Sequence, residues 1–203
     1  TAEAAAQLKP YLQPGTLVVS LQNGVGNASV LGAALPGLNV LAAMVPFNIL
    51  RKPDATFHRG TSGTIMIAST ESGSEQPLVR ALNAAGIDTK TSADMPGVLW
   101  GKLLVNLNNL VNALAGVPIK AQMENRAYRL ILAAVMGEGF RVVKQAGIKP
   151  IAMIKAPYWL VLLVMRLPDA LFKQLAKTMI KIDPEARSSM WDDLQRGRTT
   201  EVD

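Results

Sequence analysis

The sequence predicts two parts of different class, an α/β part over residues 1–95 and an all-α part over residues 96–203. Short apolar runs alternate with helical stretches before residue 93, and helical patterns alone follow Pro96. With 49% hydrophobic and 18% charged residues, the composition is that of a folded globular protein. We therefore expect a domain boundary near residues 93–96.

The first part reads as an α/β unit with helices and strands in alternation. Residues 2–12 have helical composition and are followed by the turn pair Pro14-Gly15. The run TLVVSL at residues 16–21 is β-branched and apolar, which is typical of a buried parallel strand. The other elements expected here are a helix at 28–35, strands at 40–50 and 63–69, a helix at 78–85 and a strand at 87–91.

A glycine-rich turn, QNGVGN at residues 22–27, joins the expected strand to the helix that follows it. In α/β sheets ligands bind outside the carboxyl ends of the strands, where this turn would lie. Asn23-Gly24 and Gly26 permit positive φ and a close approach of backbone to ligand. The spacing is not that of the dinucleotide fingerprint G-x-G-x-x-G, so a tight turn without a ligand stays an alternative.

The second part is expected to be helical almost throughout. Asp94 is placed to cap the first of its helices, Pro96 suits the first turn, and Gly116 with Pro118 should end it. The apolar run at 158–165 has eight residues, far short of the ~20 needed to cross a bilayer. The helices expected are 96–115, 125–147, 157–166, 169–182 and one from residue 188 onward.

Three polar residues form a stripe on the helix at 96–115. Lys102, Asn106 and Asn109 are four and three residues apart, so they lie on one face. An amine and two amides in line, beside a Leu/Val-rich surface, are suited to binding a ligand through hydrogen bonds. The alternative is that the asparagines bond to neighbouring backbone groups.

The absence of cysteine and the single histidine exclude several kinds of site. No disulfide, thiolate metal site or multi-histidine metal cluster can form, and the lack of cysteine suits a reducing cytoplasm. His58 lies in a polar, turn-like run and is expected at the surface rather than in catalysis. Any proton transfer therefore falls to Lys, Asp or Glu.

The net charge of +6 is concentrated in the second part, where residues 120–203 hold 14 basic and 9 acidic side chains. Because the basic residues are spread singly and aromatic residues are few, the pattern favours an anionic small molecule over nucleic acid as the partner.

Three motifs follow one another along the chain: SLQNGVGN at 20–27, WGKLLVN at 100–106 and SSMWDDLQRGRTTEVD at 188–203. Together, and in their order and separations, they resemble those of the ketopantoate reductase (2-dehydropantoate 2-reductase) family. The resemblance implies that residues 1–95 are the C-terminal part of a Rossmann-like NADP-binding domain. It also implies that residues 96–203 are a helical substrate and catalytic domain, with the active site in the cleft between the two domains.

The resemblance implies a role for each of five residues. Lys102 matches the catalytic lysine of a K-x-x-x-N motif, and Asn106 matches the substrate-binding asparagine four residues later. Ser189 matches a serine that holds the substrate. Asn23 matches an asparagine beside the nicotinamide, and Glu201 matches a glutamate that contacts the cofactor. The alternative for Glu201 is a surface ion pair with a neighbouring arginine.

The chain departs from the family pattern in two respects. Eight residues after the lysine some members have a second substrate asparagine, but this chain has Leu110; Asn109 could take that role, with Asn112 as the second choice. The N-terminal strand and turn that carry the glycine fingerprint are missing, and the last helix stops at Asp203. We therefore expect an internal fragment of a reductase.

The function that the resemblance implies is the NADPH-dependent reduction of ketopantoate to pantoate in pantothenate biosynthesis. The substrate would be a small 2-keto acid, with no nucleic acid or membrane as partner and a homodimer left open. A reductase of another 2-keto acid, a folded but inactive remnant and a basic interaction module stay as alternatives.

Overall fold

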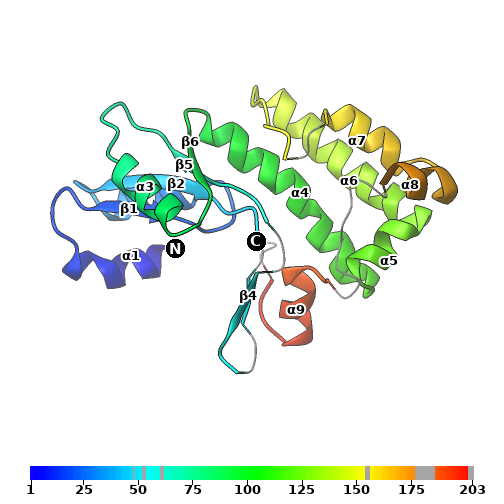
Figure 1. Cartoon of the computed structure of the whole chain (residues 1–203), viewed down its shortest axis with the longest axis horizontal. Coiled ribbons are helices and arrows are strands. Elements are labelled where there is room, and N and C mark those ends of the chain that lie inside the picture. Colours follow the sequence, from blue (N-terminus) through cyan, green and yellow to red (C-terminus); the bar gives the residue numbers. More distant parts are fainter. Residues whose placement is uncertain (48, 52–53, 60–61, 154–155, 177–185, 201–203) are drawn as a thin grey trace. The chain divides into compact units, whose positions relative to one another are not determined.

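The computed structural model of the chain is described for residues 1–47, 49–51, 54–59, 62–153, 156–176 and 186–200. The chain divides into two compact units, Thr1–Leu103 and Leu104–Asp203. The boundary lies inside one long helix, α4 (Met95–Ala115), which is continuous through it (Figure 1). Among the described helices, none combines the length and the apolar character needed to cross a bilayer.

The first unit is built around a four-stranded mixed sheet. Its strands are β1 (Leu17–Ser20), β2 (Asn39–Met44), β5 (Ile65–Ala68) and β6 (Thr89–Ser92), in the order β1-β2-β5-β6. The pairs β1–β2 and β5–β6 are parallel, whereas β2 and β5 are antiparallel. The predicted parallel character of the first strand is therefore confirmed.

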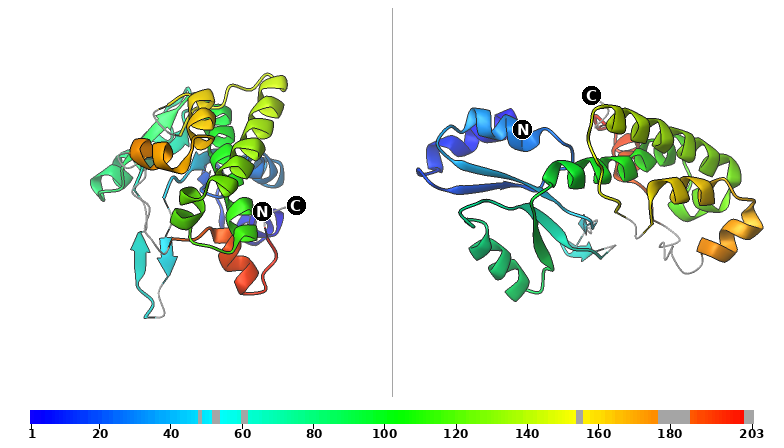
Figure 2. Two further views of the ribbon diagram at one scale, coloured as in Figure 1. Left: turned by 90° about the vertical axis from the view of Figure 1, so that its right-hand side faces the viewer. Right: turned by 90° about the horizontal axis from the view of Figure 1, so that it is seen from above.

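Helices cover both faces of this sheet, with α1 and α2 on one face and α3 on the other (Figure 2). Their bounds are α1 (Ala2–Leu8), continued by a 3-10 turn η1 (Lys9–Tyr11), α2 (Asn27–Ala34) and α3 (Gln76–Ala84). Val18 and Val40 pack into the cluster formed with α1 and α2. Val19 and Leu41, each one residue further along, pack into the cluster formed with α3. Because successive side chains of a strand point to opposite faces of the sheet, a separate hydrophobic core forms on each face.

The prediction of a single strand at 40–50 is wrong. The strand β2 ends at Met44, and β3 (Ile49–Arg51) pairs instead with β4 (Phe57–Arg59) as an antiparallel hairpin of its own. Pro46 lies between β2 and β3 and has no N–H with which to continue the ladder.

In its described residues, the second unit contains the rest of α4 and five further helices. Val111 of α4, three residues of α6 and Met165 of α7 form its buried core. The five helices are α5 (Ile119–Glu124), α6 (Arg126–Gln145), α7 (Tyr158–Met165), α8 (Asp169–Ala176) and α9 (Ser189–Gln195). The predicted succession of an α/β part and a helical part is confirmed. The short helix α5 was not predicted, and the expected continuation of α8 to residue 182 lies outside the described residues.

A glycine brings α6 close to α4. A Cβ added to Gly139 would lie 2.9 Å from Leu107 Cδ1 and 3.0 Å from Leu104 Cδ2, which is closer than side chains normally approach. The face of α4 that carries these leucines therefore packs against α6, and the Asn106–Asn109 face points about 100° or more away around the helix axis.

A buried arginine holds α6 to the segment that joins α7 and α8. The guanidinium of Arg129 is fully buried and donates hydrogen bonds to the carbonyl oxygens of Met123, Met165 and Leu167, at 2.7–3.1 Å. It also pairs with the carboxylate of Asp169 at 2.8 Å. Because every bond goes to a group of this unit, the role of Arg129 is structural.

Candidate functional site

The helix α4 has the ends that the sequence predicts. The carboxylate of Asp94 accepts a hydrogen bond of 2.9 Å from the Gly97 N–H, which caps the first turn, and Pro96 lies within that turn. At the other end Gly116 has φ +67°, the left-handed conformation that stops a helix. These caps set where the helix begins and ends, and the spacing of Lys102 and the two asparagines places them on one face of it.

Lys102, Asn106 and Asn109 are half-buried along one side of α4. Within the described part of the chain, their side chains form no hydrogen bond or ion pair. No fully buried side-chain nitrogen or oxygen among the described residues lacks a partner, so the polar ends of these three reach solvent. A stripe of half-buried polar groups with unused hydrogen-bonding capacity is suited to bind a polar ligand.

The ammonium of Lys102 lies in a partly desolvated place. Burial lowers the pKa of Lys102 from its ordinary value, because removal of water disfavours the charged form. A lysine with a lowered pKa releases its proton more readily than an exposed lysine does. This property suits a proton donor more than a residue that serves only as a fixed charge.

Asn112, the second choice for the missing substrate amide, is occupied by structural bonds. Its carboxamide is fully buried and donates to the Val117 carbonyl and to Gln122 Oε1, each at 2.9 Å. Its oxygen accepts a bond of 2.8 Å from the Ser188 N–H. With its donors and acceptor used, Asn112 is unavailable to a ligand, whereas the side chain of Asn109 is accessible.

The start of α9 is attached to the same helix. Ser188 is the N-cap: its hydroxyl accepts from the Trp191 N–H and donates to the Asn109 carbonyl, both at 3.2 Å. Ser188 is 3% exposed, whereas Ser189, the next residue, is exposed. The structure therefore brings the Ser189 position near Asn109, with Ser188 and Asn112 as the residues that hold it there. Sequence reasoning missed this anchoring role, although the N-cap preference of serine was a signal for Ser188.

Asn23 lies in the exposed turn between β1 and α2, in the first unit. Its backbone carbonyl accepts a hydrogen bond of 2.6 Å from Asn27 Nδ2, and Gly24 beside it has φ +103°. Its own carboxamide forms no bond with the described residues. Asn27, which the sequence did not single out, thus shapes the turn and leaves the Asn23 side chain accessible.

Two further predictions concern residues away from these groups. Glu201 lies outside the described residues, so its role stays a prediction. His58 is exposed on β4, which confirms its expected place at the surface. In the described part of the chain no group of three or more His, Asp or Glu side chains is arranged to hold a metal ion.

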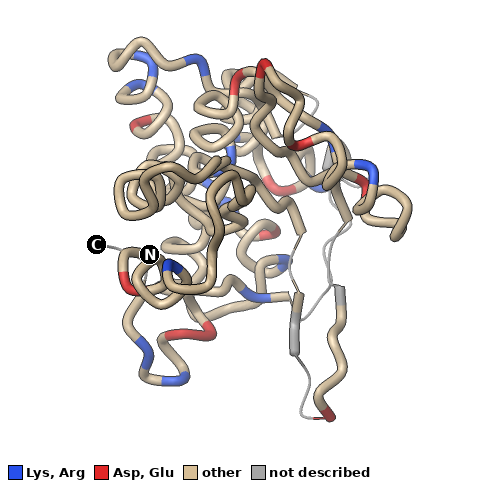
Figure 3. The backbone as a smooth tube through the Cα atoms, turned by 90° about the vertical axis from the view of Figure 1, so that its left-hand side faces the viewer, with Lys and Arg blue, Asp and Glu red and all other residues tan. Residues whose placement is uncertain are grey.

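The basic residues are distributed rather than clustered. Along the described backbone, Lys and Arg are spread over many segments, and Asp and Glu are interspersed among them (Figure 3). A nucleic-acid-binding surface usually gathers Lys and Arg on one face. The distribution is consistent with the prediction of a small anionic partner, which stays a prediction.

Comparison with known protein families identifies two matches that together cover most of the chain. Residues 94–203 match the family described as "Ketopantoate reductase PanE/ApbA C terminal", and residues 1–72 match "Ketopantoate reductase PanE/ApbA".

Individual relatives agree with these matches. The 2-dehydropantoate 2-reductase of Halobacterium salinarum is 30% identical over 152 residues, which are 73% of this chain and 50% of that protein. The crystal structure of a PanE/ApbA family ketopantoate reductase from Ralstonia eutropha has a TM-score of 0.77 at 31% identity, over 99% of this chain and 61% of that one. D-mandelate dehydrogenase with NADH and anilino(oxo)acetate shares the fold, with a TM-score of 0.76 at 16% identity over 100% and 62% of the chains.

These comparisons confirm the predicted fold class, a Rossmann-like α/β part followed by a helical domain. The chain spans 50% to 59% of the length of the curated relatives that it matches.

Proposed function

Because the chain belongs to the ketopantoate reductase family, we propose that it serves the NADPH-dependent reduction of 2-dehydropantoate to pantoate, a step in pantothenate biosynthesis. The observation that carries this proposal is the stripe of Lys102, Asn106 and Asn109 on α4, whose polar ends are accessible and form no bonds with the described residues. In coarser terms, the reaction is the reduction of a 2-keto acid with a nicotinamide cofactor.

The proposed role of Lys102 follows from the charge that develops in the reaction. NADPH, when bound, supplies the hydride that adds to the ketone carbon. The ketone oxygen then gains negative charge, which the Lys102 ammonium stabilises before it donates a proton to that oxygen. The lowered pKa of Lys102 makes this donation easier.

The remaining residues of the proposed site bind and orient. Asn106 and Asn109 are assigned to the carboxylate and the oxygen substituents of the substrate, because amides donate hydrogen bonds without adding charge. Ser189 is assigned to the same substrate from the start of α9. Asn23 is assigned to the nicotinamide, and the fit is supported by its accessible carboxamide and by the open backbone at Gly26, where an added Cβ would meet no atom within 4 Å. Glu201 is assigned to the cofactor by family resemblance alone.

The proposed setting is a cytoplasmic enzyme acting on a small 2-keto acid, with neither nucleic acid nor membrane as partner. The excess of basic residues suits an anionic substrate and cofactor. A homodimer is part of the proposal, and sedimentation of the purified protein tests it.

The reaction is tested by the oxidation of NADPH with ketopantoate, followed by absorbance. We expect Lys102→Ala to lower kcat by about 10²–10⁴-fold, the contribution of a positioned proton donor, with little change in NADPH affinity measured by calorimetry. The matched control is Lys120→Ala on α5, an exposed lysine that should leave turnover unchanged.

Each possible result of these measurements points to a different alternative. Near-normal turnover in Lys102→Ala would contradict the role of the lysine. Binding of NADPH without turnover would indicate another 2-keto acid as the substrate. Neither turnover nor binding in the chain would indicate a folded but inactive remnant, and polyanion binding that falls steeply with salt would indicate a basic interaction module.

A further inference from the structure

A buried glutamine of α5 links two asparagines of α4 in the second unit. Gln122 is fully buried. Its Nε2 donates a hydrogen bond of 2.8 Å to Asn108 Oδ1, and its Oε1 accepts one of 2.9 Å from Asn112 Nδ2. Asn108 and Asn112 lie about one turn apart on α4, so the single carboxamide of Gln122 spans both.

The carboxamide of Asn112 satisfies its partners in one orientation. Its Nδ2 donates to Gln122 Oε1 and to the Val117 carbonyl. The amide oxygen then faces the other side, where it accepts the 2.8 Å bond from the Ser188 N–H. In the reversed orientation a donor would face the Ser188 N–H, and this bond would be lost. Gln122 therefore helps to decide which end of Asn112 meets the start of α9.

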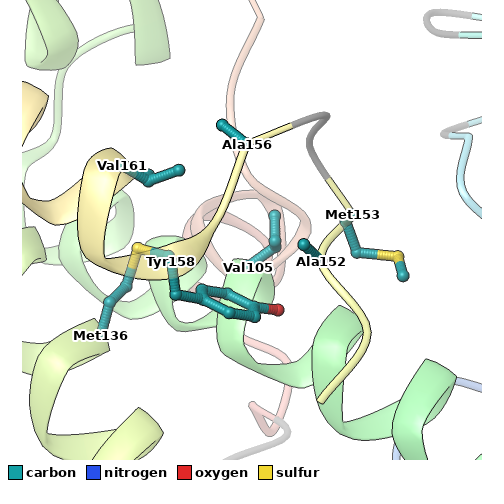
Figure 4. A pocket seen from close by; sticks show the side chains of 7 residues that line it. All are labelled: Val105, Met136, Ala152, Met153, Ala156, Tyr158 and Val161. Atoms are coloured by element: carbon teal, nitrogen blue, oxygen red, sulfur yellow. The ribbon is translucent and has the colours of Figure 1, made fainter.

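The neighbouring part of α4 is packed differently. Val105 lines a small pocket together with Met136 of α6 and with Tyr158 and Val161 of α7 (Figure 4). Apart from the phenol of Tyr158, these side chains end in carbon or sulfur. Contacts between such groups are not directional, whereas a hydrogen bond is. The amide contacts between α4 and α5 can therefore orient a neighbouring segment, which apolar contacts cannot do.

Two further bonds hold the segment before α9. The Ala186 carbonyl accepts a bond of 2.8 Å from the Ile119 N–H, and the Arg187 guanidinium donates one of 2.9 Å to the Gly116 carbonyl. Neither bond uses the side chain of Gln122. A substitution at Gln122 should therefore leave α9 attached and change only how its first residues are oriented.

We propose that Gln122 is a positioning residue of the keto-acid site; the inference rests on the proposed function. It orients Asn112, which holds the Ser188 N–H, and the Ser188 hydroxyl in turn bonds to the Asn109 carbonyl at 3.2 Å. Ser189, the next residue, is exposed and begins α9. Because hydrogen bonds weaken steeply with misalignment, a small turn of α9 would weaken the bond from Ser189 to the substrate.

Hydrogen exchange tests the link from Gln122 to Ser188 without turnover. Gln122→Met keeps the length of the side chain and removes both of its hydrogen bonds. We expect the Ser188 amide to exchange about three- to tenfold faster, the effect of one hydrogen bond. The Ile119 amide, which is bonded to Ala186, should keep its rate. An unchanged rate at Ser188, or equal acceleration at both amides, would overturn the inference.

Kinetics with ketopantoate and NADPH test the link from Gln122 to the substrate. Gln122→Met should raise KM about three- to tenfold with little change in kcat, whereas a merely structural role would lower the amount of active protein and leave KM unchanged. Ser189→Ala should raise KM by itself, and adding Gln122→Met should raise it no further, because both act on one contact. Effects that multiply would overturn the inference. The matched control is Gln145→Met at the exposed end of α6, which should change neither KM nor the Ser188 exchange rate.

Two more variants separate orientation from stability. Gln122→Glu still offers Asn112 an acceptor oxygen, so KM should stay near its original value although burial of a carboxyl group lowers stability. A KM raised as in Gln122→Met would overturn the inference. Asn108→Ala removes the other partner of Gln122 at a half-buried position and applies if Gln122→Met does not fold. It should raise KM and the Ser188 exchange rate about twofold or more, and no change in either would overturn the inference.

Failure of the proposed function gives a different pattern. If the chain without substitutions neither turns over ketopantoate nor binds it in calorimetry, the proposed function fails, and the role of Gln122 in the site fails with it. Turnover with a KM that Gln122→Met leaves unchanged rejects the role of Gln122 alone.

Discussion

The side-chain oxygen of Asn112 accepts a hydrogen bond of 2.8 Å from the backbone N–H of Ser188, 76 residues later in the chain. This bond attaches the start of α9 to α4, and the Ser188 hydroxyl adds a second link to the Asn109 carbonyl. Asn112 and Asn109 are therefore neighbours on one helix with different roles. The first holds the structure together, and the second is accessible to a ligand.

The two asparagines should separate stability from binding when each is changed to alanine. Asn112→Ala leaves the Ser188 N–H and the side-chain oxygen of Gln122 without their Asn112 partner, and we expect the free energy of unfolding in urea to fall by about 2–3 kcal/mol. Asn109→Ala should change it by no more than about 0.5 kcal/mol and should instead raise KM for the keto acid. Equal losses of stability in the two variants would contradict this assignment.

Arg129 should be among the residues whose loss most destabilises the second unit. Arg129→Met removes hydrogen bonds to the carbonyl groups of Met123, Met165 and Leu167, and we expect a loss of about 3 kcal/mol or more, measured by urea unfolding. Arg126→Met is the control on the same helix. The Arg126 side chain makes one exposed bond, to the Arg166 carbonyl, and its loss should cost less than about 1 kcal/mol.

Two glycines of α6 should respond in opposite directions to alanine. Gly139→Ala places a methyl group 2.9 Å from Leu107 Cδ1, and the resulting overpacking should outweigh the gain in helix propensity, for a net loss of about 1 kcal/mol. Gly137→Ala meets only Leu162 Cδ1 at 3.6 Å, an ordinary contact, and should gain about 0.5–1 kcal/mol. Thermal unfolding of the two variants checks the contrast, and a stabilised Gly139→Ala would show that α4 and α6 are less closely packed.

The pH dependence of turnover should report the lowered pKa of Lys102. As a proton donor the lysine acts in its protonated form, so kcat/KM should fall as pH rises through its folded-state pKa. Because burial lowers that pKa, the fall should come below the pH at which an exposed lysine loses its proton. Lys102→Arg should remove this fall, since arginine stays protonated. A profile that is flat up to the ordinary lysine range would contradict the role proposed for Lys102.

The same lowered pKa has a consequence for stability. Between the folded-state pKa and the higher unfolded-state pKa of Lys102, the unfolded chain binds more protons, so stability rises with pH across that window. Below the window the full penalty of burying the charge is present. Lys102→Met should therefore raise the free energy of unfolding at neutral pH, and the gain should shrink as pH rises through the window. Urea unfolding at several pH values measures this, with the exposed Lys120→Met as the unaffected control.

The missed hairpin shows where local pattern is insufficient. The apolar run at 40–50 looks continuous in the sequence, yet β2 ends at Met44 and Ile49–Arg51 pairs with Phe57–Arg59. The proline between them removes a donor, but the choice of a new partner strand depends on residues further along the chain. Short-range periodicity carries no information about that choice.

The sequence by itself determined the order of an α/β part and a helical part, the caps of α4 and the stripe of Lys102, Asn106 and Asn109. These features depend on residues within a few positions of each other, where helix geometry and capping chemistry suffice. Only the tertiary structure decided that Asn112 is a structural residue and that Ser188 is buried while Ser189 is exposed. It also decided that Val105 of α4 lines a small apolar pocket together with residues of α6 and α7. These features depend on hydrogen bonds and packing between segments that are far apart in the chain. An asparagine side chain can bind a ligand or a backbone group, and the fold decides which of the two lies beside it.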